Sequence, residues 1–464
     1  MKPNCFLIAI SFIFWMLISS NHILAQNSSA PHISGKVRIS MKDGLIASDI
    51  ILSNIPIKDT AFRINLNRGM NIKLFKDSAT VLKYNNPPGD EYISYRLHNG
   101  KGYVDAPKKL NITYSGAFPI YNESNNFYDY QGVIALNGKT LRATNYSKWY
   151  PVIYDTKNDT ELLDMTYDLM VECTDCKTIF LNGSEAQPGP IARFKSEKAY
   201  GLLLFTGDYE VQKFSESNFL NAEMPVDMAE AFNKQISSIK GFLESKLEIP
   251  YGQKITFIQH KAIEPYGPNK SWGFVVFPSI AVAGGRFNDQ IDMKTKKFNH
   301  LIKCSFYAHE LSHYYFGTVL IPDSTLRWFF LESIPEYLSV KATEKEYGKQ
   351  ATVDYINNAK TFLEKKTIIP LSKITKPEQI DDVYRYTYGP LLLLALEKKV
   401  GEKKIYKMFQ KALAGKNSKT DYSFLVKIAK EAAISGLEWK SFEDDLINNQ
   451  QLDVLFEHLN TVKK

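Results

Sequence analysis

The stretch His309-Glu310-Leu311-Ser312-His313 is the most informative part of this sequence, because it has the pattern H-E-x-x-H. It lies in residues 301–316, where apolar residues recur at helical spacing, and Gly317 follows as a helix stop. Residues four apart share one face of a helix, so His309 and His313 can present two imidazoles to one metal ion. Glu310 lies one step round the helix, where it reaches a water molecule at that ion. The pattern therefore predicts two metal ligands and a general base.

A third metal ligand is expected downstream, because a catalytic zinc has three protein ligands and one open position. One class of zinc peptidases places a glycine three residues and a histidine six residues after the second histidine. Phe316 and Val319 occupy those positions here, which excludes that class. A carboxylate, Glu332, lies instead among the apolar residues of Trp328-Phe329-Phe330-Leu331-Glu332, where a buried charge is costly unless it is paired or binds a metal. We therefore expect one Zn²⁺ per chain, bound by Glu332 and the two histidines.

The spacing and flanks of these residues resemble those of a known family. Eighteen residues separate His313 from Glu332, which is similar to the gluzincin family of membrane alanyl aminopeptidases and leukotriene-hydrolysing aminopeptidases. His313-Tyr314-Tyr315-Phe316-Gly317 resembles their H-Q-W-F-G, and Glu332-Ser333-Ile334-Pro335-Glu336-Tyr337 resembles their E-G-F-A-S-Y. Tyr386-Thr387-Tyr388-Gly389 resembles their Y-x-K-G, whose tyrosine donates a hydrogen bond to the tetrahedral intermediate. The resemblance gives that role to Tyr386, with Tyr384 and Tyr388 as alternatives.

The sequence departs from the family at its exopeptidase signature, G-A-M-E-N. Gly284-Gly285-Arg286-Phe287-Asn288 lies at the corresponding distance before the metal-binding helix, with Phe287 in place of the glutamate that binds the α-amino group of the substrate. A cation–π contact from that ring to an ammonium would contribute about 0.5–2 kcal/mol. We expect Gly284, Gly285 and Phe287 to contact the substrate, with the peptide added as a strand beside the two glycines.

These residues together predict hydrolysis of peptide bonds. A zinc ion lowers the pKa of its water from 15.7 toward about 7, so Glu310 could accept a proton and pass it to the leaving amine. Tyr386 would stabilise the oxyanion. The expected function is an exported, aminopeptidase-like zinc metallopeptidase. Two alternatives stay open: an endopeptidase, and a non-catalytic exported binding protein stabilised by zinc, which would need neither the base nor the tyrosine.

The two halves of the chain differ in hydrophobic pattern. Up to residue 214, short β-type segments, among them 61–66, 110–114 and 200–205, alternate with turns such as Asn137-Gly138. From residue 215 helical spacing prevails, first in a helix expected at 224–247, with β-type segments at 254–258 and 271–277. With the resemblance, this predicts an α+β multidomain fold: an N-terminal antiparallel β sandwich or saddle, a thermolysin-like zinc peptidase domain and C-terminal helices. The expected parts are a signal peptide (1–25), a linker (26–32), the β domain (33–214), the catalytic domain (215–400) and a helical segment (401–464).

The N-terminus has the three regions of a secretory signal. Lys2 precedes an apolar run at residues 6–18, and cleavage is expected after Ala25. The run is shorter than the ~20 apolar residues that cross a bilayer, so we expect no stable membrane insertion once the signal is removed. The mature protein is therefore expected in the periplasm or outside the cell.

Composition and cysteine content narrow the partners and the compartment. The 57 Lys and Arg exceed the 50 Asp and Glu by 7, but this excess is scattered and forms no basic stripe, so the expected partner is a peptide substrate and not nucleic acid. Cys173 and Cys176 form either a local disulfide or two thiols. Cys304 is expected to pack as a small buried apolar group.

Overall fold

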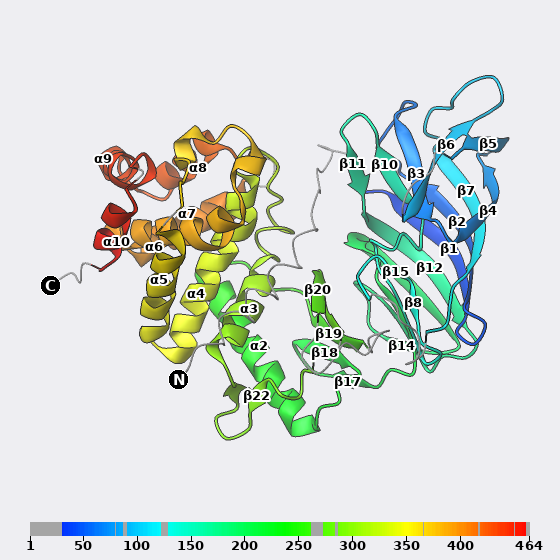
Figure 1. The fold of residues 1–464 in the computed structure, drawn as a ribbon, viewed down its shortest axis with the longest axis horizontal. Helices are drawn as coiled ribbons and strands as arrows, with labels where there is room; N and C mark the ends of the chain where they lie inside the picture. Colours follow the sequence, from blue (N-terminus) through cyan, green and yellow to red (C-terminus); the bar gives the residue numbers. More distant parts are fainter. Residues whose placement is uncertain are drawn as a thin grey trace. The chain divides into compact units, whose positions relative to one another are not determined.

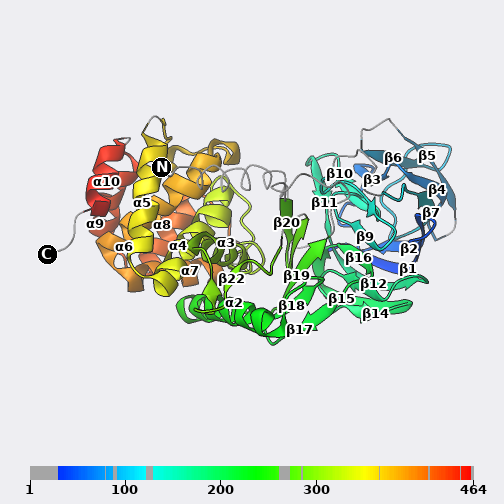
Figure 2. The same cartoon turned by 60° about the horizontal axis from the view of Figure 1, so that its bottom comes forward.

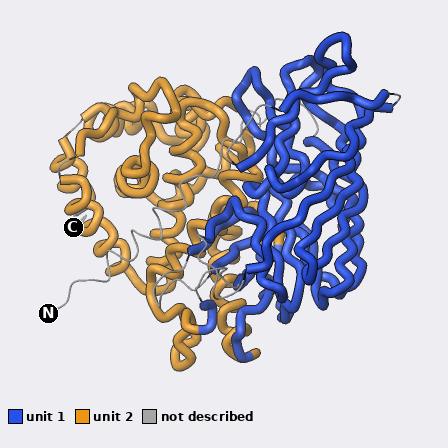
Figure 3. Tube along the Cα trace, turned by 45° about the vertical axis from the view of Figure 1, so that its right-hand side comes forward, with its two compact units in different colours: residues 1–225, 254–288 blue, residues 226–253, 289–464 orange. Residues whose placement is uncertain are grey.

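The computed structural model describes most of the chain after the N-terminal segment. The predicted signal peptide, most of the predicted linker, and Gly284 and Gly285 lie outside the described residues. By their contacts the residues form two compact units (Figure 3). We call Met1–Pro225 with Lys254–Asn288 the β-rich unit, and Val226–Gln253 with Asp289–Lys464 the helical unit. The described residues are 30–78, 80–86, 91–121, 129–260, 272–283, 286–364, 366–415, 418–449 and 451–460.

The β-rich unit is built on an eleven-stranded sheet with the order β11-β10-β3-β6-β5-β4-β7-β2-β1-β12-β15 (Figure 1). Most neighbours run antiparallel, as predicted, but β1 and β12 run parallel, with Val37 opposite Val171. A parallel pair needs a long connection, which the many residues between these two strands supply. The strands are β1 (His32–Ser40), β2 (Leu45–Ser53), β3 (Phe62–Asn67), β4 (Met70–Lys76), β5 (Val81–Asn85), β6 (Tyr92–His98), β7 (Lys109–Ala117), β10 (Val152–Asp155), β11 (Thr160–Leu162), β12 (Asp164–Cys173) and β15 (Ile191–Gly201).

A second sheet, with the order β14-β13-β16-β9-β8, shares one apolar core with the first. Trp149 is fully buried in this core and donates its indole N–H to the carbonyl of Leu202 at 3.0 Å. The predicted strand at 200–205 is interrupted, because the chain leaves the first sheet after Gly201 and enters the second at Leu204. The strands are β8 (Ala135–Leu136), β9 (Thr140–Ala143), β13 (Thr178–Leu181), β14 (Gln187–Pro188) and β16 (Leu204–Gly207).

A third sheet of the β-rich unit has the order β17-β18-β19-β21-β20. Strand β19 runs parallel to both of its neighbours, and β20 pairs antiparallel with β21 at one edge. The β-type segments predicted at 254–258 and 271–277 correspond to β19 and β20. The strands are β17 (Val211–Lys213), β18 (Ser217–Leu220), β19 (Ile255–His260), β20 (Trp272–Val276) and β21 (Ser279–Ala283).

The helical unit contains the longest described helix, α2 (Val226–Leu247), which was predicted at 224–247. Helix α4 packs against both α3 and α5 (Figures 1 and 2). No helix in the described part of the chain is both long and apolar enough to cross a membrane. The other elements are β22 (Ile291–Asp292), β23 (Lys297–Phe298), α3 (Leu301–Ser312), η1 (Phe329–Ser333), α4 (Ile334–Tyr347), α5 (Gln350–Leu363), η2 (Leu371–Lys373), η3 (Pro377–Gln379), η4 (Tyr384–Tyr388), α6 (Gly389–Val400), α7 (Glu402–Ala414), α8 (Tyr422–Glu431), α9 (Gly436–Phe442), η5 (Glu443–Ile447) and α10 (Leu452–Asn460).

Helix α3 is shorter than predicted. It was expected to run to residue 316 and ends at Ser312, with His313 as its C-terminal cap in a helical conformation. The N–H groups of Tyr314 and Tyr315 bond to carbonyls three residues back, so the chain tightens at this point. His309 and His313 nevertheless remain one helical turn apart, because the cap residue still has α-helical backbone angles.

Candidate metal centre

The three predicted metal ligands meet within the helical unit. His309 lies in the last turn of α3 and His313 caps it, while Glu332 comes from the π-helical turn η1. The Nε2 atoms of the two histidines are 3.2 Å apart. Oε2 of Glu332 lies 3.3 Å from Nε2 of His309 and 3.6 Å from Nε2 of His313. Tetrahedral ligands of a zinc ion lie about 3.3 Å from one another, so this donor set fits one zinc ion.

The electrostatics of the donors also suit a metal. Burial lowers the pKa of His313 to about 4, so its imidazole is neutral and has a free lone pair at neutral pH. Burial opposes charge on Glu332, but the nearby histidines outweigh this effect and hold its pKa below the usual value. These are the protonation states in which these two side chains bind zinc. Burial opposes charge on His309, but its hydrogen bonds to Glu332 and Glu336 outweigh this effect and hold its pKa well above the usual value, so zinc would have to displace a proton from this ring.

A fourth side chain, Glu336, orients the ring of His309. Its Oε2 lies 2.8 Å from Nδ1 of His309, so Nε2 of that ring is directed to the other donors. Metal-binding histidines usually donate their second ring N–H to such a carboxylate. No role was predicted for Glu336 from the sequence. Its position four residues after Glu332, which places both side chains on one face of a helix, could have indicated that it lies near the metal donors.

Glu310, the predicted general base, is buried beside the metal donors. Burial is the main cause that raises its pKa to about 7, and the negative charges of Glu332 and Glu336 act in the same direction. The charge of His309 opposes this shift. A carboxyl group with a pKa near the working pH can both accept a proton and return it.

Of the three candidate tyrosines, Tyr386 lies beside the donors. Its ring centroid is 5.8 Å from that of His309, and burial together with the charges of Glu332 and Glu310 raises its pKa above the ordinary value. Tyr384 and Tyr388 are buried, and their rings pack edge-on at 5.1 Å. The position of Tyr386 therefore suits the role that the resemblance assigned to it.

Two π-helical turns, η1 and η4, carry Glu332 and Tyr386, and they pack closely together. The hydroxyl of Ser333 donates to the carbonyl of Tyr384 at 3.5 Å. A Cβ atom added at Gly389 would lie 2.2 Å from Oγ of Ser333 and 3.0 Å from the carbonyl oxygen of Tyr384. The absence of a side chain at Gly389 thus permits the contact that holds the two turns together.

No protein-family model and no curated protein matches this sequence, whereas solved structures match its fold. The M1 zinc metallopeptidase of Deinococcus radiodurans has a TM-score of 0.59 at 12% identity, over 92% of this chain and 96% of that chain. A mutant of it bound to a Tyr-Ser-Ala substrate has a TM-score of 0.58, at the same identity and coverage. Yeast LTA4 hydrolase has a TM-score of 0.57 at 12% identity, over 96% of this chain and 71% of that chain.

The chain has the fold of the M1 zinc metallopeptidases. The predicted α+β class is confirmed, with a large β-rich N-terminal part followed by a helical C-terminal part.

Of the three residues predicted to contact substrate, Gly284 and Gly285 lie outside the described residues, and Phe287 is buried. Strand β21 ends at Ala283, directly before Gly284 in the sequence. It pairs with β19 on one side and with β20 on the other as far as Ala283. The predicted strand addition lies beyond these pairs, beside Gly284 and Gly285, and stays a prediction. Phe287 has no exposed surface, and its ring meets Phe257 at 5.7 Å in the core of the β-rich unit. A buried ring offers no face to a substrate ammonium.

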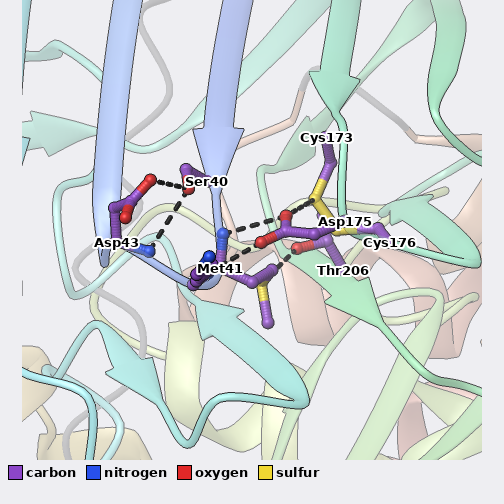
Figure 4. Close-up of a disulfide and its surroundings, with 8 residues drawn as sticks. Ser40, Met41, Asp43, Cys173, Asp175, Cys176 and Thr206 are labelled. Carbon is purple, nitrogen blue, oxygen red and sulfur yellow. Dashed lines mark hydrogen bonds between the residues drawn. A yellow bond between two sulfur atoms is a disulfide. The ribbon is translucent and has the colours of Figure 1, made fainter.

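A second group of potential metal ligands, Cys173, Asp175 and Cys176, lies in the β-rich unit (Figure 4). The two sulfurs form a disulfide with each other, the first of the two states that the sequence left open. The carboxylate of Asp175 accepts the backbone N–H groups of Met41 at 3.0 Å and Lys42 at 2.7 Å. Metals bind thiolates, and these two sulfurs are joined to each other while the carboxylate already accepts hydrogen bonds, so this group does not suit a metal. Cys304 is buried, as predicted.

Proposed function

We propose that this protein is an exported zinc metallopeptidase that hydrolyses peptide bonds and resembles aminopeptidases in its specificity. The proposal rests on one observation: His309, His313 and Glu332 converge at distances that suit zinc, with Glu310 and Tyr386 beside them. The M1 zinc metallopeptidase fold supports it, and the Tyr-Ser-Ala substrate of the Deinococcus radiodurans mutant supports a peptide as the ligand. Export rests on the signal sequence at residues 1–25.

The roles of the side chains follow from their positions. Zinc bound by the two histidines and Glu332 would supply a Lewis acid that polarises the scissile carbonyl and acidifies a water molecule. Glu310 accepts the proton of the attacking water and returns it to the leaving amine, and its burial beside the metal donors places it for this role. The hydroxyl of Tyr386 donates a hydrogen bond to the oxyanion as charge develops on it. Glu336 keeps His309 in the orientation that binds the metal.

An endopeptidase is the second candidate function. It is favoured by Phe287, which replaces the glutamate expected to bind the α-amino group and is buried away from solvent. Without a carboxylate at that position, recognition of a free N-terminus would depend on other groups. Free and acetylated forms of one peptide library distinguish the two candidates.

The first experiment compares zinc-loaded mature protein with the Glu310→Gln variant on that library, with products identified by mass spectrometry. Loss of the general base is expected to reduce turnover by about 10²–10⁴-fold, while the zinc content stays at one per chain. Trimming of free peptides only would indicate an aminopeptidase, and internal cuts in both forms an endopeptidase. The control is Glu431→Gln, an exposed position on α8, which should keep full activity.

The same experiment can contradict the proposal. If Glu310→Gln loses zinc together with activity, Glu310 is a ligand or a structural group and not the base. If wild-type protein holds zinc and cleaves no peptide, the non-catalytic binding protein becomes the better interpretation.

A further inference from the structure

Two arginines face each other on neighbouring strands of the eleven-stranded sheet. On strands β3 and β6, Ile64 lies opposite Tyr95. Arg63 and Arg96 are the next residues along these antiparallel strands, so they are opposite each other as well. On the other side of β6, Asn85 of β5 lies directly opposite Arg96. Side chains directly opposite one another share one face of a sheet. The two guanidinium groups therefore lie side by side on that face.

This arrangement is unfavourable for the fold taken alone. Like charges directly opposite each other destabilise a sheet. Burial lowers the pKa of Arg63, and the charge of Arg96 lowers it further. Among the described residues, Tyr103 and Tyr154 also influence the pKa of Arg63, and no carboxylate is among the causes of its shift. Nη1 of Arg63 and Nε of Arg96 are both buried and have no hydrogen-bond partner among the described residues. Buried donors without partners are costly, and no negative group among the described residues compensates these two.

The two arginines line a cavity of about 440 Å³, together with Asn85, Asn86 and Tyr103. This volume lies within the range of about 300–1,000 Å³ that is typical of small-molecule sites. The guanidinium of Arg96 stacks on the ring of Tyr103 at 3.2 Å from its centroid. The amide of Asn85 donates to the hydroxyl of Tyr103 at 3.2 Å. Arg96 is therefore held in place, and the cavity combines two cations with two amides and one phenol.

We propose that this cavity binds a small hydroxylated anion, an acidic or phosphorylated sugar, through an oxyanion held between Arg63 and Arg96. Guanidinium groups match carboxylate and phosphate oxygens in geometry and charge. Such a group supplies the negative charge that the two arginines lack and accepts hydrogen bonds from their buried donors. The amides of Asn85 and Asn86 suit hydroxyl groups of the same ligand. The site belongs to the β-rich unit and does not depend on the proposed peptidase activity.

The test is calorimetric titration of the mature protein with D-glucuronate, D-glucose 6-phosphate and uncharged D-glucose. At least one anionic sugar is expected to bind at least tenfold more tightly than glucose, and the preferred one identifies the oxyanion as carboxylate or phosphate. The double variant Arg63→Gln/Arg96→Gln should weaken that binding at least tenfold. The double variant Lys101→Gln/Lys108→Gln removes the same charge from exposed positions of this unit and should bind as wild type does.

Thermal unfolding distinguishes two interpretations of Arg63 and Arg96: that they bind a ligand, or that they stabilise the fold. Because the two arginines repel each other, Arg63→Gln without ligand is expected to keep or raise the unfolding midpoint. A lower midpoint would mean that Arg63 stabilises the fold, and the proposal would be wrong. Binding of neither anionic sugar at millimolar concentration, or equal binding by wild type and the arginine double variant, would overturn it as well.

Discussion

Three glutamates surround His309, and their positions give them different roles. Oε2 of Glu332 lies 3.3 Å from Nε2 of His309, on the side of the metal donors. Oε2 of Glu336 lies 2.8 Å from Nδ1, on the opposite side of the same ring. Glu310, beside them on α3, has a pKa raised to about 7, mainly by burial. One residue type thus serves as ligand, orienting group and base, because each carboxylate has a different environment.

The role of Tyr386 can be tested with a neighbouring tyrosine as control. Tyr386→Phe removes the hydroxyl that donates to the oxyanion, so kcat is expected to fall about 10²–10³-fold with KM and zinc content unchanged. Tyr384→Phe makes the same chemical change two residues away, where the buried hydroxyl has no hydrogen-bond partner among the described residues. That variant should keep its activity and its unfolding temperature. Steady-state kinetics would contradict the assignment if both variants lost activity equally.

A site residue could be predicted from the sequence when the residues that it acts with are close to it in the chain. His309, Glu310 and His313 lie within one helical turn, so their spacing alone brings them together. Glu332 was predicted from its apolar neighbours and from the family resemblance. Phe287 could not be placed correctly, because its burial against Phe257 comes from tertiary packing that no local pattern records.

At the scale of elements, the candidate site depends on two π-helical turns. Glu332 lies in η1 and Tyr386 in η4, and each turn leads directly into an α-helix. Such turns are rare and are frequently found at functional sites. The two turns meet at Ser333 and Gly389. The close packing of the turn that carries Glu332 against the turn that carries Tyr386 thus depends on the absence of a side chain at Gly389.

That contact predicts the effect of Gly389→Ala. The added Cβ would lie 2.2 Å from Oγ of Ser333, so the turns must separate at a cost of about 1–3 kcal/mol. We expect a lower unfolding temperature and a fall in kcat/KM of more than tenfold, measured on a peptide substrate. Adding Ser333→Gly removes the clash and should restore much of the activity.

Gly241→Ala is the matched control for this change. Gly241 lies within α2, and an added Cβ there would meet no atom within 4 Å. Alanine should therefore stabilise the helix by about 1 kcal/mol and leave activity unchanged. Full activity in Gly389→Ala would show that η1 and η4 are not coupled through this glycine.

The elements themselves were predicted where the hydrophobic period was clear. Helix α2 and strands β3, β7 and β19 lie close to their expected positions because their apolar residues follow one period. The interrupted strand at 200–205 was not foreseen, since Leu202 and Leu203 are both buried while the chain passes between sheets. The parallel pairing of β1 with β12 joins residues far apart in sequence, and a local pattern cannot predict such a partner.

At the scale of the whole molecule, the candidate metal centre belongs to one unit. His309, His313, Glu332, Glu336 and Tyr386 all lie within Asp289–Lys464, which belongs to the helical unit. A metal that binds only the folded state stabilises what it holds together. Zinc should therefore stabilise the helical unit much more than the β-rich unit.

Hydrogen exchange measured by mass spectrometry, with and without zinc, tests whether zinc stabilises the helical unit more than the β-rich unit. At free zinc about 1,000 times Kd, the expected stabilisation of the folded helical unit is about 4 kcal/mol. Slower exchange should appear in α3, α4 and α6, which hold or flank the donors, while β1 and β2 should exchange as before. His313→Ala removes one donor and should abolish the effect of zinc. Equal protection of both units would mean that they unfold together, and protection confined to the β-rich unit would show that zinc binds elsewhere.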